Sequence, residues 1–329
     1  MANPHRPCEF DLIARYFAPL AAGEAGAFGL TDDAAVLTPS PGWATVTTAD
    51  AMVAGVHFLP EDPPDLIARK LLRVNLSDLA AMGARPRGYT LAMALPSTLP
   101  ADAFLESFTT GLKLDQDQYA LGLFGGDSVS TPGPLTLTVT IFGEIVKGCE
   151  TRRSGAQVGD DIYVSGTIGD AALGLGVARG ELSSAGDGPA KFLRDRYHLP
   201  RPRVDLGIAL VGVASACMDV SDGLVQDLGH LLRASNVGGD LNLDEVPVSQ
   251  AAQHCLDAGL VGFERLMEGD DYELLFTAPN SKRSEIEAAA DHSKTPVRRI
   301  GEITEKSGLS LRGRERGTLS LDGLGYRHA

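Results

Sequence analysis

The segment at residues 135–146 alternates apolar and polar side chains, and this alternation limits the folds that the chain can adopt. It sets four apolar residues against three threonines: Leu135, Leu137, Val139 and Ile141 against Thr136, Thr138 and Thr140. Successive side chains of a strand point to opposite faces of a sheet. The pattern therefore predicts a strand with one buried face and one polar face.

Further strand-like and helix-like segments alternate along the first part of the chain. Strands are expected at residues 44–48, 89–95 and 119–124, and helices at 10–22, 65–82 and 102–113. The helix at 65–82 begins after two prolines and stops at Gly83, which are the usual boundary signals. The pattern breaks in a polar, glycine-containing stretch at 147–159, where we place the boundary between two domains, residues 1–147 and 148–329.

The second part of the chain shows the same mixture. Strands are expected at 161–165, near 240–243, at 272–277 and near 297–303, and a further strand should end at Asp219. Helices are expected at 170–179, after Pro202, at 224–235 and at 282–292. Residues 180–188 should form a surface loop. A chain of 329 residues is also long for one compact core. The predicted fold class is therefore α/β (α+β), with two mixed α/β domains.

The composition excludes several classes of function. Hydrophobic residues make up 43% and charged residues 22% of the chain, which is ordinary for a globular protein. A formal net charge of -14 argues against nucleic-acid binding, which needs a basic face. No apolar run approaches the length of a membrane span, and the N-terminus has no signal-peptide core. The four cysteines form no CxxC pair, so we expect a reduced, cytoplasmic protein without zinc.

Aspartates in loops and at strand ends are the first candidates for a functional site. Asp32 and Asp33 follow a Gly/Ala-rich stretch, and Asp50 follows the strand expected at 44–48. A solvated turn also explains each of these positions. Metal binding is the alternative, because carboxylate oxygens are the ligands that hard cations prefer.

Asp78 stands out on the helix expected at 65–82. On a helical wheel, Asn75 and Asp78 fall inside the broad apolar face, whereas Arg69, Lys70 and Arg73 lie opposite. A carboxylate on a buried face is unfavourable unless it is paired, hydrogen-bonded or bound to metal. We favour a metal ligand, with a structural cap or an arginine pair as the alternative.

Two Gly-Gly-Asp triplets occur in different contexts. Gly125-Gly126-Asp127 follows an apolar strand, where glycines let the backbone approach a ligand and expose N–H groups to an anion. Gly238-Gly239-Asp240 follows the helix at 224–235, where glycine is the expected helix stop. The first triplet is a site candidate, and the second is interpreted as a cap.

Two acidic clusters follow in the second domain. Asp219, Ser221 and Asp222 crowd three oxygen-bearing side chains before the helix at 224–235. Ser221 or Asp222 could simply be the N-cap, but a helix N-terminus also suits a phosphate and its metal. The second cluster, EGDDYE at 268–273, contains Asp270 and would alone suggest a solvated loop.

Together these aspartates form an oxygen-only ligand set, which suits Mg²⁺ rather than zinc. The chain has no GxxxxGK[ST] loop, no HRD…DFG set, no GxGxxG between a strand and a helix, and no GxSxG elbow. The residues therefore predict a magnesium-dependent kinase outside the common nucleotide-binding motifs.

Seven segments, read in order, resemble the thiamine-monophosphate kinase family of the aminoimidazole ribonucleotide synthetase-like superfamily. The segments are TDDAAVL, TADAMVAGVHF, KLLRVNLSDLAAMGARP, FGGD, TRRSGAQVGDDIYVSGTIGD, DVSDGL and GDDYELLFT. The resemblance runs from about residue 10 to Tyr326, and VAGVHF with NLSDLAAMGA and DVSDG makes it specific.

The resemblance implies transfer of the γ-phosphoryl group of ATP to thiamine monophosphate, with several Mg²⁺ ions. It implies metal ligands at Asp32, Thr48, Ala49, Asp50, Asp78, Asp127, Asp219 and Asp222, of which Asp50, Asp78, Asp127 and Asp222 are also the expected catalytic residues. It implies ATP contacts at Gly126, Asp127, Arg153 and Ser221, and thiamine phosphate contacts at His57, Asp270 and Tyr326. It also implies a homodimer that pairs the N-terminal sheets, with the second domain completing the cleft.

Three positions depart from the family pattern. Thr31 and Glu268 replace expected glycines, which puts the backbone freedom of their loops in question. Ala49 replaces a Ser or Thr, so a metal contact there would use its main-chain carbonyl. None of the three removes a carboxylate ligand.

Phosphate chemistry agrees with the absence of a nucleophile motif. The second pKa of a phosphate monoester is near 6, so the attacking oxygen is largely deprotonated at neutral pH. The reaction then needs charge neutralisation and in-line positioning of two anions. We expect direct transfer without a phosphoenzyme.

Two other functions remain open at this point. The chain could be another ATP-dependent synthetase of the same superfamily, although Cys8 lacks the glycine-rich setting of a reactive cysteine. It could also be a non-catalytic metal- or nucleotide-binding relative that kept the fold.

Overall fold

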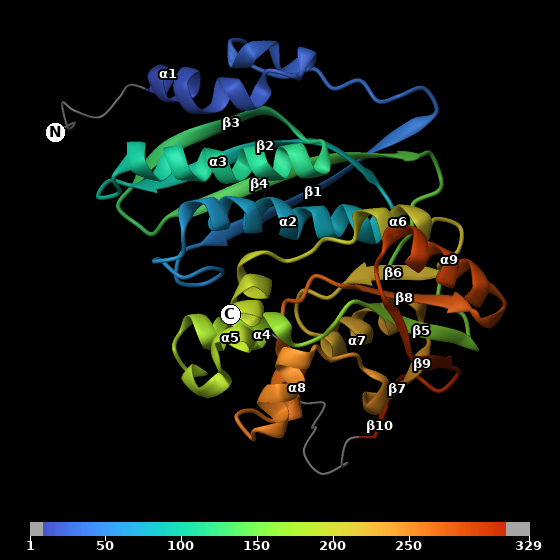
Figure 1. Ribbon diagram of the computed structural model, residues 1–329. Helices are drawn as coiled ribbons and strands as arrows, with labels where there is room; N and C mark the ends of the chain where they lie inside the picture. The colour runs from blue at the N-terminus through green and yellow to red at the C-terminus, as the bar shows by residue number, and fades with distance from the viewer. Residues whose placement is uncertain (1–8, 314–329) are drawn as a thin grey trace. The chain divides into compact units, whose positions relative to one another are not determined.

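The computed structural model describes residues 9–313, and the chain divides into two compact units (Figure 1). Unit 1 extends to Leu79 and resumes over Arg85–Lys147. Unit 2 comprises Ala80–Ala84 and the chain from Gly148 onward. Both units contain a sheet and helices, so the predicted mixed α/β class is confirmed.

Unit 1 is built on a four-stranded sheet in the order β1-β4-β2-β3. The strands are β1 (Trp43–Val53), β2 (Arg85–Pro96), β3 (Gly122–Thr131) and β4 (Thr136–Val146). β4 pairs antiparallel with both β1 and β2, whereas β2 and β3 are parallel. The alternation at 135–146 behaves as predicted, because Leu137, Val139 and Ile141 are fully buried.

The helices α2 (Pro64–Met82) and α3 (Ala101–Tyr119) run along the sheet of unit 1 (Figure 1). α2 confirms the helix expected at 65–82, but its charged stripe is not solvated: Lys70 and Arg73 are buried. Arg73 Nε donates to Asp115 on α3 at 2.6 Å, and Lys70 Nζ donates to the carbonyl of His57 at 3.3 Å. α3 therefore contributes to burying the charged face of α2.

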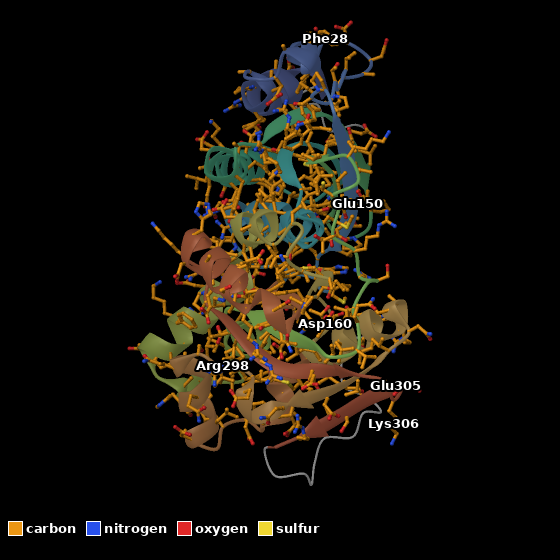
Figure 2. The ribbon with its side chains drawn as sticks, turned by 90° about the vertical axis from the view of Figure 1, so that its right-hand side faces the viewer. Phe28, Glu150, Asp160, Arg298, Glu305 and Lys306 are labelled. Atoms are coloured by element: carbon orange, nitrogen blue, oxygen red, sulfur yellow. The ribbon has the colours of Figure 1, made fainter. Side chains whose placement is uncertain are left out.

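The N-terminal segment of unit 1 is a series of short helical turns. They are α1 (Glu9–Leu12), a π-helical turn (Ile13–Phe17) and two 3₁₀ turns (Ala18–Ala21 and Ala25–Leu30). Phe28 projects from the last of them (Figure 2), is 46% exposed and has a left-handed backbone with φ of 50°.

Unit 2 is built on a six-stranded sheet in the order β10-β7-β9-β5-β8-β6. The strands are β5 (Asp160–Ser165), β6 (Ala216–Asp219), β7 (Gly238–Asn242), β8 (Leu274–Pro279), β9 (Val297–Thr304) and β10 (Gly308–Arg312). All neighbours are antiparallel except β7 and β10. Glu305 and Lys306 mark the turn between β9 and β10 (Figure 2).

The helices of unit 2 are α4 (Asp170–Ala178), α5 (Asp187–His198), α6 (Val204–Ala209), α7 (Leu224–Ser235), α8 (Gln250–Asp257) and α9 (Arg283–Ser293). α7 packs on the sheet, since its Leu228 and Leu231 share one core with Ile162 and Val164 of β5. No helix in residues 9–313 is long and apolar enough to cross a membrane.

Several elements differ from the sequence predictions. α3 continues to Tyr119 and ends at Ala120, whose left-handed φ of 54° stops the helix, so β3 starts only at Gly122. α5 and α8 had no predicted counterpart, and α5 begins inside the stretch expected to be a loop. β10 lies beyond the strand expected to be last.

Candidate active site

The first group of predicted site residues lies on β1 and α2 of unit 1. β1 continues to Val53, so Asp50 lies inside a strand and not, as predicted, where the chain leaves the sheet. Thr48 and Asp50 are two residues apart and therefore share a face of the sheet. Thr48 Oγ1 donates to Asp78 Oδ2 at 2.6 Å, which joins the strand to the helix. Asp78 is only half-buried.

The electrostatics of this group favour a bound cation. Burial, followed by the charge of Asp78, raises the pKa of Asp50 to about 6. Within the described residues no basic side chain pairs with Asp50. Two carboxylates and a hydroxyl are a donor set that fits Mg²⁺. Ala49, between Thr48 and Asp50, is exposed and pairs with Thr140.

The shifted pKa of Asp50 predicts a pH-dependent stability in metal-free buffer. Its folded pKa lies above the ordinary 3.8, so stability is fully present below pH 4 and is lost as the pH rises through about 6. We expect the wild type to lose roughly 2 kcal/mol of unfolding free energy between pH 4.5 and 7.5 relative to Asp50→Asn. Guanidinium titrations in EDTA measure this. Asp291→Asn, an exposed change on α9, should keep the wild-type slope, and equal slopes for all three proteins would refute the assignment.

The first Gly-Gly-Asp triplet lies within β3 and not at its exit as predicted. A Cβ on Gly126 would stand 1.9 Å from the carbonyl oxygen of Leu91 on β2, so only glycine fits this close approach. The carboxylate of the exposed Asp127 accepts the main-chain N–H of Ser128 at 2.8 Å. The strand thus holds Asp127 at the surface, next to two glycines that carry no side chain.

Asp127 and Asp32 line one cavity of about 930 Å³ in unit 1. Its lining includes the acidic Asp32, Asp33 and Asp127 and apolar residues such as Phe17 and Leu91. Thr31, which replaces an expected glycine, has a φ of -105° and donates its hydroxyl to Phe28 at 2.8 Å. The loop therefore does not need glycine at that position.

His57 is held by the turn that follows β1. The main-chain N–H of Val53 donates to His57 Nδ1 at 3.0 Å. Nδ1 is then the acceptor, so the neutral ring carries its proton on Nε2. The half-buried ring is consistent with the predicted substrate contact but equally with a packed histidine.

The second acidic group follows β6 in unit 2. The N-cap of α7 is Gly223, with φ of 108°, and neither Ser221 nor Asp222 caps the helix as the alternative interpretation held. The carboxylate of Asp227 instead accepts the main-chain N–H groups of Ser221 and Asp222, each at 3.0 Å. Asp227 thereby fixes the loop that carries both predicted site residues.

The sequence analysis did not identify Asp227. Its position could have indicated a role, because it lies in the first turn of a helix that follows an acidic loop. Burial raises its pKa to about 7; hydrogen bonds from the loop backbone and the charge of Arg153 act in the opposite direction. Arg153 and Asp222 also both act on His230, whose pKa is lowered first by burial and then by Arg233 and Arg153. Arg153 and Asp222 therefore share one electrostatic environment.

The acidic loop at 268–273 lies beside the loop after β6. Tyr272 N–H donates to the carbonyl of Val220 at 2.9 Å, and Val220 N–H donates to that of Glu273 at 2.8 Å. These bonds bring Asp270 to the same edge of the sheet as Asp219 and Asp222. The predicted solvated loop is wrong for its last part, because Asp271 and Glu273 are buried.

Asp271 and Glu273 anchor this loop. Asp271 accepts the N–H groups of Gly169 at 2.6 Å and Ala171 at 3.0 Å, at the start of α4. Glu273 binds Arg196 and Arg203. Glu268, the other departure from the family pattern, pairs with Arg265 at 3.1 Å.

Three further predictions have different outcomes. The cap interpretation of Gly238-Gly239-Asp240 is wrong, because Asn236 ends α7 in the left-handed conformation and Gly238 already starts β7. Tyr326 lies outside the described residues. Within residues 9–313, no three His, Cys, Asp or Glu side chains are grouped to hold a metal ion. The predicted metal ligands are divided between the two units. Unit 1 contains Asp32, Thr48, Ala49, Asp50, Asp78 and Asp127, and unit 2 contains Asp219 and Asp222.

Family comparison defines the class of protein to which this arrangement belongs. Residues 31–145 match the N-terminal domain of AIR synthase related proteins, and residues 157–314 match the C-terminal domain. The chain thus has both domains of that class, in order.

Individual relatives narrow the class. The chain is 43% identical over 328 residues to thiamine-monophosphate kinase of Caulobacter vibrioides (98% of this chain, 91% of the relative) and 40% identical over 322 residues to that of Salmonella typhimurium (97% and 98%). The chain belongs to the thiamine-monophosphate kinase family.

Solved structures agree. The crystal structure of thiamine-monophosphate kinase from Stenotrophomonas maltophilia superposes with a TM-score of 0.83 at 41% identity, covering 93% of this chain and 97% of that one. AaThiL complexed with AMPPCP and TMP superposes with a TM-score of 0.76 at 28% identity, covering 93% and 98%.

Proposed function

We propose that the chain transfers the γ-phosphoryl group of Mg-ATP to thiamine monophosphate, giving thiamine diphosphate and ADP. The observation that carries this proposal is the identity of about 40% over nearly the whole chain to thiamine-monophosphate kinases. The Thr48, Asp50 and Asp78 group supports it, since it supplies negative oxygen donors that call for a cation. A related structure that contains AMPPCP and TMP supports the choice of both substrates.

The proposed transfer is direct. An oxygen of the acceptor phosphate attacks the γ-phosphorus, the bond to the bridging oxygen breaks, and ADP leaves with that electron pair. The acceptor is already anionic near neutral pH, so no side chain needs to remove its proton. The protein must hold two mutually repelling anions in line.

The residues divide into three proposed roles. Thr48, Asp50 and Asp78, with Asp32, Ala49, Asp127, Asp219 and Asp222, would hold Mg²⁺. When bound, Mg²⁺ neutralises phosphate charge and helps to position both anions. Gly126, Asp127, Arg153 and Ser221 would contact the nucleotide, and His57 and Asp270 the thiamine phosphate.

The cavity beside Asp32 and Asp127 suits the nucleotide in unit 1. Its apolar lining residues suit the faces of a purine ring, and its aspartates would meet phosphates only through bound cations. Gly125, whose added Cβ would meet nothing within 4 Å, leaves the main chain of β3 open at this point.

One assay tests the proposal directly. Purified protein is incubated with Mg-ATP and either thiamine monophosphate or free thiamine, and thiamine diphosphate and ADP are measured by chromatography. Stoichiometric formation of both products from the monophosphate alone is expected. Folded protein that makes no thiamine diphosphate would overturn the proposal, and omission of Mg²⁺ should remove the activity.

We also propose a cytoplasmic homodimer that pairs the four-stranded sheets. Supporting this, Thr47, Ala49 and Ala51 on β1 are exposed on the face opposite Thr48 and Asp50. Light scattering after size-exclusion chromatography should give twice the chain mass, and Ala51→Arg should give the monomer mass. A wild-type monomer at micromolar concentration would contradict the proposal.

A further inference from the structure

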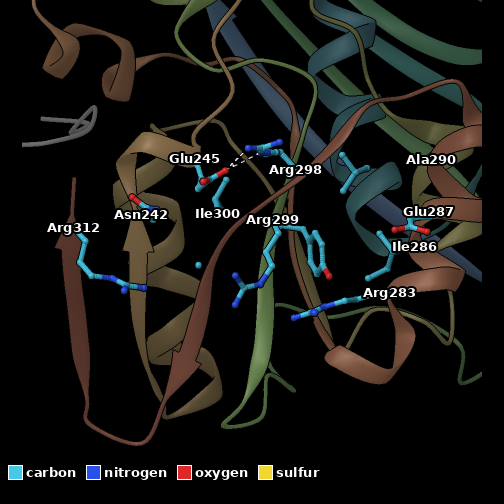
Figure 3. Close-up of a pocket in the computed structure, with 13 residues that line it drawn as sticks. Asn242, Glu245, Arg283, Ile286, Glu287, Ala290, Arg298, Arg299, Ile300 and Arg312 are labelled. Atoms are coloured by element: carbon cyan, nitrogen blue, oxygen red, sulfur yellow. Dashed lines mark hydrogen bonds and ion pairs between the residues drawn. The ribbon is translucent and has the colours of Figure 1, made fainter. Parts of the chain in front are cut away.

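A second, arginine-lined pocket lies on unit 2 (Figure 3). It has a volume of about 520 Å³. Arg298 and Arg299 of β9 and Arg283 of α9 line it together with Arg312 of β10. Such a volume falls in the range of small-molecule sites.

This arginine pocket is separate from the acidic loops of unit 2. Tyr163 of β5 lines the pocket, whereas its neighbours Ile162 and Val164 belong to the core under α7. Asp161 pairs with Ala278 near the end of β8, whereas Asp219 pairs with Leu274 at its start. Among the lining residues only Ile300 also belongs to that core, and the pocket lies toward the end of β8 opposite Asp219.

One buried carboxylate serves two of the four arginines. Arg283 donates to Asp161 from Nε at 2.7 Å and from Nη2 at 3.0 Å, and Arg299 Nε donates to the same carboxylate. The Asp161 side chain is 2% exposed, whereas the side chains of Arg283 and Arg299 are 54% and 45% exposed. Arg299 Nη2 also lies 3.5 Å from Glu302 Oε2, and both guanidinium-bearing side chains stay about half exposed on the pocket lining.

The other two arginines of the pocket, Arg298 and Arg312, differ in their partners. Arg298 donates from Nε to Glu245 at 3.0 Å, the pair joined by dashed lines in Figure 3. Arg312 has no hydrogen bond or ion pair to any of the described residues. Four carboxylates lie near the four arginines: Glu245 and Glu287 on the lining, Asp161 beneath it, and Glu302, whose Oε2 lies 3.5 Å from Arg299 Nη2. The charges balance in number, but Arg312 is not paired with any of these carboxylates.

We propose that the arginine pocket binds a small, soluble phosphate-bearing anion. Guanidinium groups present planar pairs of N–H donors that match phosphate oxygens. Arg299 and Arg283 are already oriented by Asp161, so their ordering upon binding costs little additional entropy. Arg298 and Arg312 also line the pocket, and Arg312, which pairs with none of the described residues, provides a charge that a phosphate group would compensate.

Pyrophosphate is the probe, measured by titration calorimetry with the full chain in EDTA. Without divalent cations, the acidic loops repel the probe, so binding reports on the arginine pocket. The wild type should bind one pyrophosphate per chain, with affinity falling as salt rises. Arg312→Gln should weaken binding at least tenfold, while Arg179→Gln, an exposed change on unit 2 outside the pocket, should leave it within twofold.

A second variant keeps the test decisive if Arg312→Gln folds poorly. Arg298→Gln removes a half-exposed side chain from the same lining and should also weaken binding at least tenfold. Absence of saturable binding to the wild type, or changes below threefold in both folded variants, would overturn the proposal. Kinase activity of both variants at fixed substrate concentrations should equal that of the wild type, which separates this test from the proposed function.

Discussion

Asp78→Asn is expected to lower the turnover of thiamine monophosphate by about a thousandfold or more, roughly 4 kcal/mol of transition-state stabilisation. Asp78 accepts a hydrogen bond from Thr48 Oγ1, and the amide oxygen of asparagine can still accept it. The substitution therefore preserves the contact between α2 and β1. It removes one of the two negative charges that the proposed Mg²⁺ would neutralise.

The same substitution should not destabilise the metal-free protein. The charge of Asp78 helps to raise the pKa of Asp50 to about 6, so its removal relieves repulsion between the two side chains. We expect an unfolding free energy in EDTA equal to or above that of the wild type. Loss of activity without loss of stability distinguishes a ligand from a structural carboxylate.

Steady-state kinetics and guanidinium unfolding of the same preparations provide the measurement. Asp117→Asn is the matched control, because Asp117 pairs with Lys113 on the exposed face of α3. That control should retain activity within twofold. Asp78→Asn with a tenth or more of wild-type activity would show that Asp78 is structural.

Local periodicity predicted the elements whose stabilising contacts are close in sequence. α7 occupies the predicted residues 224–235, because its apolar positions recur at helical spacing against one core. β4 followed from simple alternation. In these elements the buried positions are the positions of the regularly spaced apolar residues in the sequence.

Long-range contacts account for features that the local sequence pattern did not predict. The charged stripe of α2 is buried because Asp115, on a helix that follows after a full strand, pairs with Arg69 and Arg73. β1 extends beyond Asp50 because β4 pairs with it through Val53. Neither partner can be identified from the local spacing of residues.

In the candidate site, too, the sequence predicted some of the residues, and long-range contacts determine the others. The sequence identified acidic residues at Asp50, Asp78 and Asp222, and the structure joins the first two to one cluster. It did not identify the support beneath the loops, because Asp227 and Glu273 are distinguished only by burial and by their partners. The arginine pocket likewise combines side chains from three separate elements.

Glu273→Gln is expected to lower the free energy of unfolding by roughly 3–5 kcal/mol, the usual loss when one partner of a buried ion pair is removed. Glu273 is fully buried and receives both Nε and Nη2 of Arg203 at 2.6 Å. Arg196 Nη2 donates to it at 3.0 Å and Ser165 Oγ at 2.5 Å. The neutral amide would remove the carboxylate that the two guanidinium groups share and would point N–H groups at them, although Arg196 Nε would keep Asp170 at 3.8 Å.

Chemical unfolding followed by circular dichroism measures the loss. Glu302→Gln is the control, since Glu302 is 53% exposed and pairs with Arg299 at 3.5 Å, so its removal should change stability by less than about 0.5 kcal/mol. Arg203→Gln and the double variant complete a mutant cycle. A double variant no less stable than Glu273→Gln alone would show that the stranded charge, rather than the lost contact, dominates.

Activity measurements distinguish a structural role of Glu273 from a catalytic one. The hydrogen bonds between Val220 and the 272–273 backbone do not involve the Glu273 carboxylate, so Asp219 and Asp270 keep their main-chain connection in the variant. Folded Glu273→Gln should therefore retain turnover within about tenfold at low temperature, a change of at most ~1.4 kcal/mol in the barrier. A large stability loss with a small kinetic loss identifies Glu273 as a positioning residue. A thousandfold loss of turnover in protein that remains folded would instead place its carboxylate in the reaction.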